Sequence, residues 1–153
     1  MKYLFFILMG ATIFSCNATD KKESAEEKEQ KELRNEAAMK DSANYTLIQW
    51  IDSTTQNLGE IKAGQEVELT WKFKNAGEKP LIVQDVLPTC GCTVASKPKE
   101  PIAPGEEGII KATYNSRGDA GKHVSKQMTV YANIKNHNNG ADTKLGFAAD
   151  VKE

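Results

Sequence analysis

The residues with the clearest chemical potential in this 153-residue chain are Cys90 and Cys92, with Gly91 between them. Three interpretations are open. As a disulfide, the pair would close a very short ring, because residues i and i+2 of a strand lie about 6.6 Å apart, near the upper limit for such a bond. Gly91 would relax the backbone enough for closure, and the bond would be strained and readily reduced. As thiolates, the pair could hold a soft metal such as Cu(I) or Zn²⁺; as free thiols, they would simply pack in a tight turn.

A metal site would need further ligands, because a lone Cys-x-Cys pair supplies only two. The candidates are His123, His137 and Met128, and their positions in the sequence do not place them beside the cysteines. The two histidines are also the available bases for a cysteine nucleophile, but polar, loop-like sequence around both favours surface positions. No Gly-rich phosphate loop, metalloprotease motif or Gly-x-Ser-x-Gly motif is present. We therefore expect no catalytic residue and no cofactor, with thiol redox activity as the alternative.

The N-terminus has the pattern of an export signal. Residues 1–15 place one Lys before an apolar run that is too short to cross a membrane as a helix. The run ends at Ile13, with Ser15 directly before Cys16, and this spacing resembles the lipobox of bacterial lipoproteins. The resemblance implies cleavage before Cys16, a diacylglyceryl thioether on its sulfur and further acylation, of the palmitate type. Several acyl chains would then anchor the mature protein firmly to a membrane of the bacterial cell envelope.

A charged tether is predicted over residues 16–44. About half of its side chains are charged and none is aromatic, so it cannot bury enough apolar surface to fold alone. Strong helix formers dominate it, and acidic and basic residues recur at the i,i+4 spacing that supports a helix. We expect a solvated spacer that is partly helical over about residues 22–39.

From residue 45 the apolar period changes to two, which is typical of strands with one buried face. In the best example, Trp71 and Phe73 are predicted to face the core and Lys72 the solvent. Turn-forming residues separate such runs, and the Arg117-Gly118-Asp119 triplet is interpreted as one of these turns instead of an adhesion motif. The pattern predicts an all-β fold: an immunoglobulin-like antiparallel β-sandwich of about seven strands over residues 45–153. The expected strand segments are 67–73, 80–87, 110–114, 124–134 and 145–151.

Several motifs of this domain, taken in order, resemble a known family. They are Leu58-Gly59-Glu60-Ile61-Lys62-Ala63-Gly64, Trp71-Lys72-Phe73-Lys74-Asn75-Ala76-Gly77, Pro80-Leu81-Ile82-Val83, Pro88-Thr89-Cys90-Gly91-Cys92-Thr93 and Ile102-Ala103-Pro104-Gly105-Glu106 with Gly108. The chain is similar to the bacterial domain-of-unknown-function family 1573, a group of exported, often lipid-anchored, immunoglobulin-like proteins. The similarity covers about residues 46–134, and the Cys-Gly-Cys-Thr block is its most specific part. It implies the fold and the export, but no settled activity.

Charge limits the range of functions. The chain has 20 Lys and Arg against 21 Asp and Glu, which excludes a strongly basic nucleic-acid binder. We expect a monomeric binding or structural module of the cell envelope, held to the membrane through Cys16. Its partner would be an envelope protein or a glycan, recognised by a sheet edge or by the loops at one end of the sandwich. The alternative is a thiol-redox or copper- or zinc-handling protein that uses Cys90 and Cys92.

Overall fold

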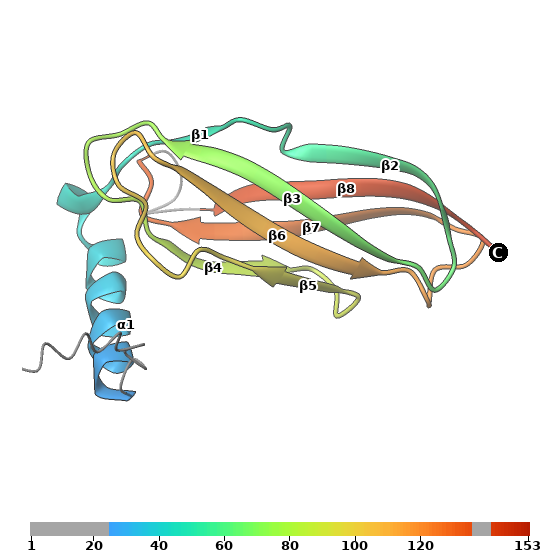
Figure 1. Cartoon of the computed structure of the whole chain (residues 1–153), viewed down its shortest axis with the longest axis horizontal. Coiled ribbons are helices and arrows are strands. Elements are labelled where there is room, and N and C mark those ends of the chain that lie inside the picture. The colour runs from blue at the N-terminus through green and yellow to red at the C-terminus, as the bar shows by residue number, and fades with distance from the viewer. Residues whose placement is uncertain (1–24, 136–141) are drawn as a thin grey trace, which may run out of the picture.

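Two four-stranded sheets face each other across a buried core in the computed structural model, which describes residues 25–135 and 142–153 (Figure 1). The elements are α1 Ala25–Lys40, the 3₁₀ helix η1 Ser42–Asn44, β1 Ile48–Trp50, β2 Thr55–Lys62, β3 Glu66–Asn75, β4 Val83–Pro88, β5 Thr93–Ser96, β6 Glu107–Asn115, β7 His123–Ala132 and β8 Asp142–Lys152. The predicted signal peptide, Cys16 and His137 lie outside the described residues.

The strands are ordered β1-β3-β6-β5 in one sheet and β2-β8-β7-β4 in the other. Immunoglobulin-like sandwiches divide their strands between two sheets in this way, so the predicted fold class is confirmed. Two details differ from the prediction. The described residues form eight strands instead of about seven, and β2 runs parallel to β8 while the other pairs are antiparallel. Both differences arise because the segment after β1 crosses to the second sheet as β2, so that one stretch of chain pairs with both sheets.

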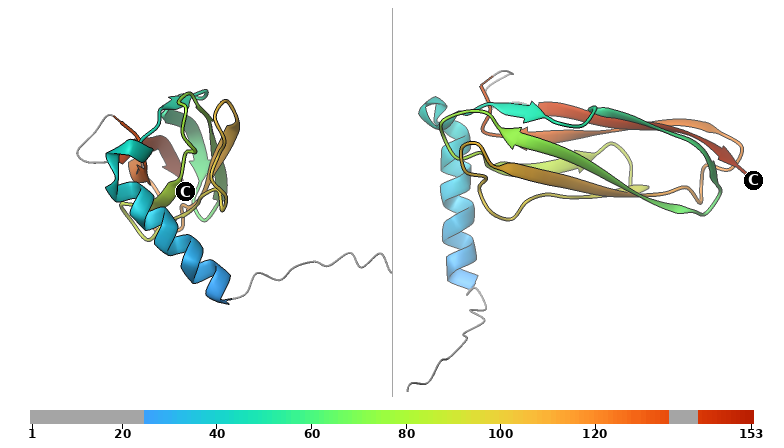
Figure 2. Two further views of the ribbon diagram at one scale, coloured as in Figure 1. Left: turned by 90° about the vertical axis from the view of Figure 1, so that its left-hand side faces the viewer. Right: turned by 45° about the horizontal axis from the view of Figure 1, so that its top comes forward.

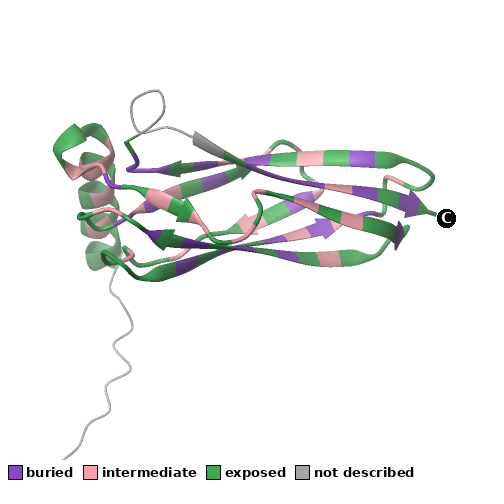
Figure 3. Cartoon of the chain, turned by 90° about the horizontal axis from the view of Figure 1, so that it is seen from above, coloured by how far each residue is buried: buried purple, intermediate pink, exposed green. Residues whose placement is uncertain are grey.

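Strand β3 shows why this sequence forms a sandwich. Leu69, Trp71 and Phe73 are buried, and the residues between them, such as Lys72, are exposed. The predicted positions of Trp71 and Phe73 in the core are therefore confirmed. Val67, expected on the same face, is half-buried and packs against the core. Figure 3 shows the same alternation of buried and exposed residues along the other strands.

One glycine of the similarity motif has a packing role. Gly108 of β6 lies opposite Phe73 of β3, and a Cβ atom at this position would lie 2.4 Å from Cζ of the Phe73 ring. The ring is fully buried and meets Trp50 edge-on, with 5.6 Å between the ring centroids. Because the ring cannot move away cheaply in a packed core, this position requires a residue without a side chain.

The charged segment before the sandwich contains the expected helix. α1 spans Ala25–Lys40, contains no buried residue and stands across one end of the sandwich, opposite the C-terminus (Figures 1 and 2). It is more than a solvated spacer, because Lys31 forms an ion pair with Glu100, and the Tyr45 hydroxyl donates to the Met39 carbonyl at 3.1 Å. No helix among the described residues has the length and apolarity needed to cross a membrane.

Candidate functional site

Cys90 and Cys92 lie in the turn between β4 and β5 and are joined by a disulfide, with 5.3 Å between their Cα atoms. The preceding strand, β4, spans Val83–Pro88 where the segment 80–87 was predicted, and an extended strand resumes at Thr93. Proline is tolerated at this position because β4 is an edge strand, where fewer backbone donors are needed. Of the three interpretations of the pair, the structure therefore contains the disulfide.

The turn is fastened to both sheets by backbone groups. Thr89 donates from its backbone N–H and from its hydroxyl to the Gln127 carbonyl of β7, each at 3.0 Å. The N–H of Asn115, the last residue of β6, donates to the Cys92 carbonyl at 2.9 Å. These bonds hold the turn in the part of the sandwich that lies away from α1 (Figure 1).

The sulfur atoms are half-buried beside a buried hydroxyl. Thr93 is 5% exposed, and its Oγ1 atom lies 3.8 Å from Sγ of Cys90 and 3.9 Å from Sγ of Cys92. Cys92 also packs against the hydrophobic core, while the Gly91 position between the two cysteines faces open space. The turn thus presents a sulfur pair at the surface with a hydroxyl behind it.

Of the other suggested ligands, His123 and Met128 lie among the described residues, and each has surroundings of its own. His123 is exposed, and its Nδ1 atom lies 2.7 Å from Oδ1 of Asp150 across the β7–β8 pair. The predicted surface position of His123 is therefore confirmed. Met128 is fully buried in the core. Within residues 25–135 and 142–153, no three or more His, Cys, Asp or Glu side chains are grouped to hold a metal ion.

Sequence analysis missed a polar cluster at the same end of the sandwich. The Tyr114 hydroxyl, in a fully buried residue, donates to Oδ2 of Asp119 at 2.7 Å, and Lys126 pairs with the same oxygen at 3.2 Å. Lys126 is the residue that interrupts the apolar parity of β7, and its ion pair explains why a charge is tolerated there. Tyr114 and Lys126 thus bind the Asp119 carboxylate from the side of the sandwich. This favours a structural role for Asp119 in its turn.

The cluster predicts a specific dependence of stability on pH. The hydrogen bond from Tyr114, followed by the interactions with Lys126, lowers the pKa of Asp119 below its ordinary value of 3.8. A lowered pKa in the folded state stabilises the protein fully above the ordinary value, and this contribution is lost as the pH falls through the folded-state pKa. Asp119→Asn should therefore lower stability at neutral pH by about 1.5–3 kcal/mol and flatten the acid side of a plot of melting temperature against pH. Parallel plots for the two proteins would contradict this account.

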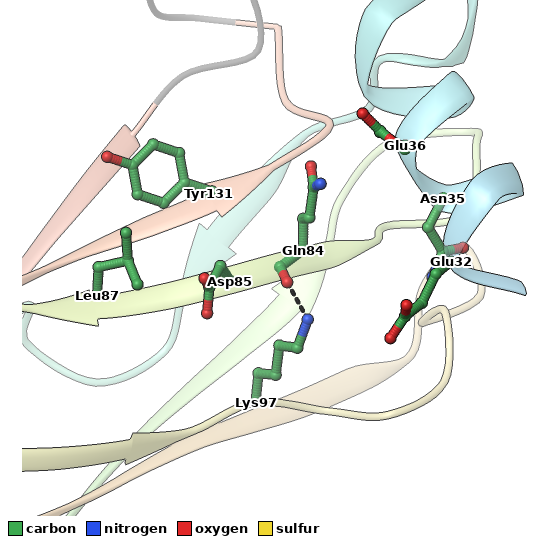
Figure 4. Close-up of a pocket in the computed structure, with 8 residues that line it drawn as sticks. All are labelled: Glu32, Asn35, Glu36, Gln84, Asp85, Leu87, Lys97 and Tyr131. Carbon is green, nitrogen blue, oxygen red and sulfur yellow. Dashed lines mark hydrogen bonds between the residues drawn. The ribbon is translucent and has the colours of Figure 1, made fainter. Parts of the chain in front are cut away.

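A hollow of about 490 Å³ opens at the other end of the sandwich, between α1 and the edge strand β4 (Figure 4). Two of its lining residues, Leu87 and Tyr131, are apolar or aromatic and remain 47% and 39% exposed. Lys97 donates from Nζ to the Gln84 carbonyl of β4, as the dashed line in Figure 4 shows. The complete lining is Glu32, Asn35, Glu36, Gln84, Asp85, Leu87, Lys97 and Tyr131. The lining therefore contains three carboxylates and one ammonium group.

Two buried asparagines fix the chain around this end, Asn133 at the end of the predicted strand 124–134 and Asn75 in a predicted turn; their roles were not predicted. Asn133 donates from Nδ2 to the Asn44 carbonyl at 2.7 Å and to the Pro80 carbonyl at 2.9 Å, and its Oδ1 accepts from the Ile82 N–H at 2.7 Å. These contacts join the segment after α1 to the segment that leads into β4, so they help to set the separation of the two walls of the hollow.

Asn75 is the second of these residues. Its Nδ2 donates to the carbonyls of Lys79 and Ile102, at 2.8 and 2.9 Å, and its Oδ1 accepts from the Thr46 hydroxyl at 2.9 Å and from the Gly77 N–H at 3.1 Å. A Cβ atom on Gly77 would lie 2.1 Å from the Thr46 hydroxyl oxygen. The Asn-Ala-Gly motif at 75–77 thus binds Thr46 and holds the segment before β1 against the sandwich.

Comparison with known proteins identifies the fold more firmly than the function. The family model described as "Protein of unknown function (DUF1573)" matches residues 49–149. No curated protein is detectably similar to the chain in sequence.

Two solved structures share the fold at low sequence identity. A protein of unknown function from Porphyromonas gingivalis W83 is 15% identical, with a TM-score of 0.58, over 72% of this chain and 49% of that one. The chain therefore spans about half the length of that protein. The ASH/PapD-like domain of human CEP192 (PapD-like domain 7) is 11% identical, with a TM-score of 0.52, over 72% of this chain and 88% of the domain. At these identities the likeness concerns the fold alone.

Proposed function

Because the chain belongs to the DUF1573 family, whose description leaves the activity open, we propose a function from its own residues. The protein is anchored by lipid in the bacterial cell envelope, and its immunoglobulin-like domain binds a protein partner. The observation that carries the binding role is the hollow between α1 and β4, where Leu87 and Tyr131 remain exposed beside β4, the outermost strand of its sheet. A free edge can add a strand from another protein, with neighbouring pockets receiving its side chains.

The charges of the hollow suggest what the partner carries. Asp85 lies near the two apolar side chains, and Glu32 and Glu36 line the α1 side of the hollow (Figure 4). Glu36 pairs with Lys40 at 3.0 Å, and the one ammonium group of the lining, that of Lys97, is bonded to the β4 backbone. Electrostatic complementarity therefore favours an extended segment with a basic side chain next to apolar ones. Binding of a glycan would depend less on these carboxylates and on the apolar contacts of Leu87 and Tyr131.

The binding role can be tested with two matched variants used as baits in envelope extract. Leu87→Lys removes an apolar contact and adds a positive charge that repels the partner's basic side chain, so it should reduce recovery of the partner at least about tenfold. Val94→Lys is the control, since Val94 is 72% exposed on the opposite sheet and should leave recovery unchanged. Recovery by the wild type should also fall with salt. Equal recovery by both variants, or a partner released by glycosidases, would contradict the proposal.

The anchor has a separate test. Cys16 follows an export-type signal, and the tether separates it from the sandwich. Cys16→Ala should therefore move the protein from the membrane fraction to the aqueous fraction without changing its melting temperature, because acyl chains supply the membrane affinity. Fractionation with detection by antibody measures this directly. A variant that stays in the membrane fraction would refute anchoring through Cys16.

A further inference from the structure

The Cys90–Cys92 disulfide ties no strand to another. It joins residues two positions apart within one turn. In the chain-entropy account, the stabilisation by a disulfide grows with the length of the loop that it closes in the unfolded chain. A loop this short constrains the unfolded chain very little, so structural stabilisation is a poor explanation for the bond.

The turn also keeps its shape through other contacts. The backbone N–H and the hydroxyl of Thr89 hold one side to Gln127 of β7, and the Asn115 N–H holds the Cys92 carbonyl to β6. Both ends of the turn belong to paired strands. Opening the disulfide would therefore leave the two sulfur atoms held near each other by the surrounding sheets.

The sulfur pair is accessible to another thiol. Cys90 and Cys92 are half-buried, Gly91 is exposed, and a Cβ atom on Gly91 would meet no atom within 4 Å. Of the two cysteines, Cys92 is the one that packs against the core. An incoming thiolate must approach along the S–S axis, and this arrangement favours attack at Cys90, with Cys92 as the leaving group.

Thr93 is placed to stabilise that leaving group. Its buried Oγ1 atom lies 3.9 Å from Sγ of Cys92 and 3.8 Å from Sγ of Cys90. A hydroxyl has little to gain from a disulfide sulfur, which is a weak acceptor. It gains a charge-assisted hydrogen bond as soon as either sulfur becomes a thiolate, and such a bond favours the charged form.

We propose that Cys90 and Cys92 form a thiol–disulfide exchange site that accepts two electrons from a dithiol of another protein. One thiolate of the donor attacks Sγ of Cys90, the Cys90–Cys92 bond breaks, and its electron pair leaves on Sγ of Cys92, where the Thr93 hydroxyl donates. The second donor thiolate then attacks the donor sulfur of the mixed disulfide and releases Cys90. The donor leaves as a disulfide, having lost two protons, and the two cysteines take up two protons as thiols. This activity goes beyond the proposed binding function and does not depend on it.

The test uses the purified full chain with dithiothreitol as the dithiol probe, and measures the rate of thiol appearance by alkylation from acid to alkaline pH. Thr93→Val keeps the shape of the side chain and removes the hydroxyl, so the rate of reduction at neutral pH should fall about tenfold. The pH profile for alkylation of the reduced cysteines, which follows their own ionisation, should move to higher pH. Ser96→Ala removes an exposed hydroxyl at the other end of β5, away from the sulfur atoms, and should leave the rate within about twofold of the wild type.

Single-cysteine variants test which sulfur is attacked. Cys92→Ser retains Cys90 and should form a mixed disulfide with oxidised glutathione faster than Cys90→Ser does. The reduced wild type and the double Ser variant should melt within a few degrees of the oxidised chain. A disulfide that resists dithiothreitol, equal rates for Thr93→Val and the wild type, or a large loss of melting temperature on reduction would each overturn the proposal.

Discussion

Trp71→Ala should lower the free energy of unfolding by about 3–5 kcal/mol, a large part of the 5–15 kcal/mol that typically stabilises a domain of this size. Trp71 is fully buried at the centre of β3, and it is the largest side chain in the core. Its Nε1 atom has no hydrogen-bond partner among the described residues, so Trp71 contributes through apolar contact alone. Removing it leaves a cavity between the sheets that the paired strands cannot collapse to fill. Denaturant unfolding monitored by far-UV circular dichroism measures the loss.

The control is the next residue of the same strand. Lys72 lies on the exposed face, and Lys72→Ala should change the free energy of unfolding by less than about 0.5 kcal/mol. Since adjacent strand residues point to opposite faces, the contrast tests the register of β3 directly. Similar losses for the two variants would show that this register is wrong.

Asn133→Ala should have the second-largest effect, about 2–4 kcal/mol. The substitution leaves the carbonyls of Asn44 and Pro80 and the N–H of Ile82 without their partner, and each buried polar group without a hydrogen bond costs about 1–3 kcal/mol, partly relieved by water. Because these bonds join the segment after α1 to the segment that leads into β4, and α1 and β4 are the two walls of the hollow, the variant should also weaken recovery of the partner. Thermal unfolding and the same bait experiment measure the two effects.

An exposed asparagine provides the matched control. Asn57 accepts a single hydrogen bond, from the Gly59 N–H at 2.9 Å, and water can replace it. Asn57→Ala should therefore lower stability by no more than about 1 kcal/mol. If Asn133→Ala were equally mild, the segment that leads from α1 into the sandwich would be held by other contacts.

The strands were the most predictable part of this protein. A strand with one buried face must alternate apolar and polar residues, and β3, β7 and β8 do so over most of their lengths. Three strands were not predicted. β1 and β5 have three and four residues, too few for a period to show, and β2 contains an irregularity between Asn57 and Glu60 that breaks its alternation. The crossing from β1 to β2 was also missed, since no local pattern distinguishes a strand that changes sheets from one interrupted strand.

The sequence by itself determined the sandwich class, the core position of Trp71 and the helical segment before the domain, because all three depend on local periodicity and composition. It also placed Cys90 and Cys92 in a turn, since Pro88 and Gly91 act on the neighbouring backbone alone.

Only the tertiary structure decided which groups from distant segments meet. The hydroxyl of Tyr114 with Asp119, the carbonyls around Asn133 and the lining of the hollow all join residues whose encounter depends on how the sheets stack. An isolated asparagine or aspartate has the same local propensities whether it ends up in solvent or in the core, so its role emerges only when packing removes the competing water.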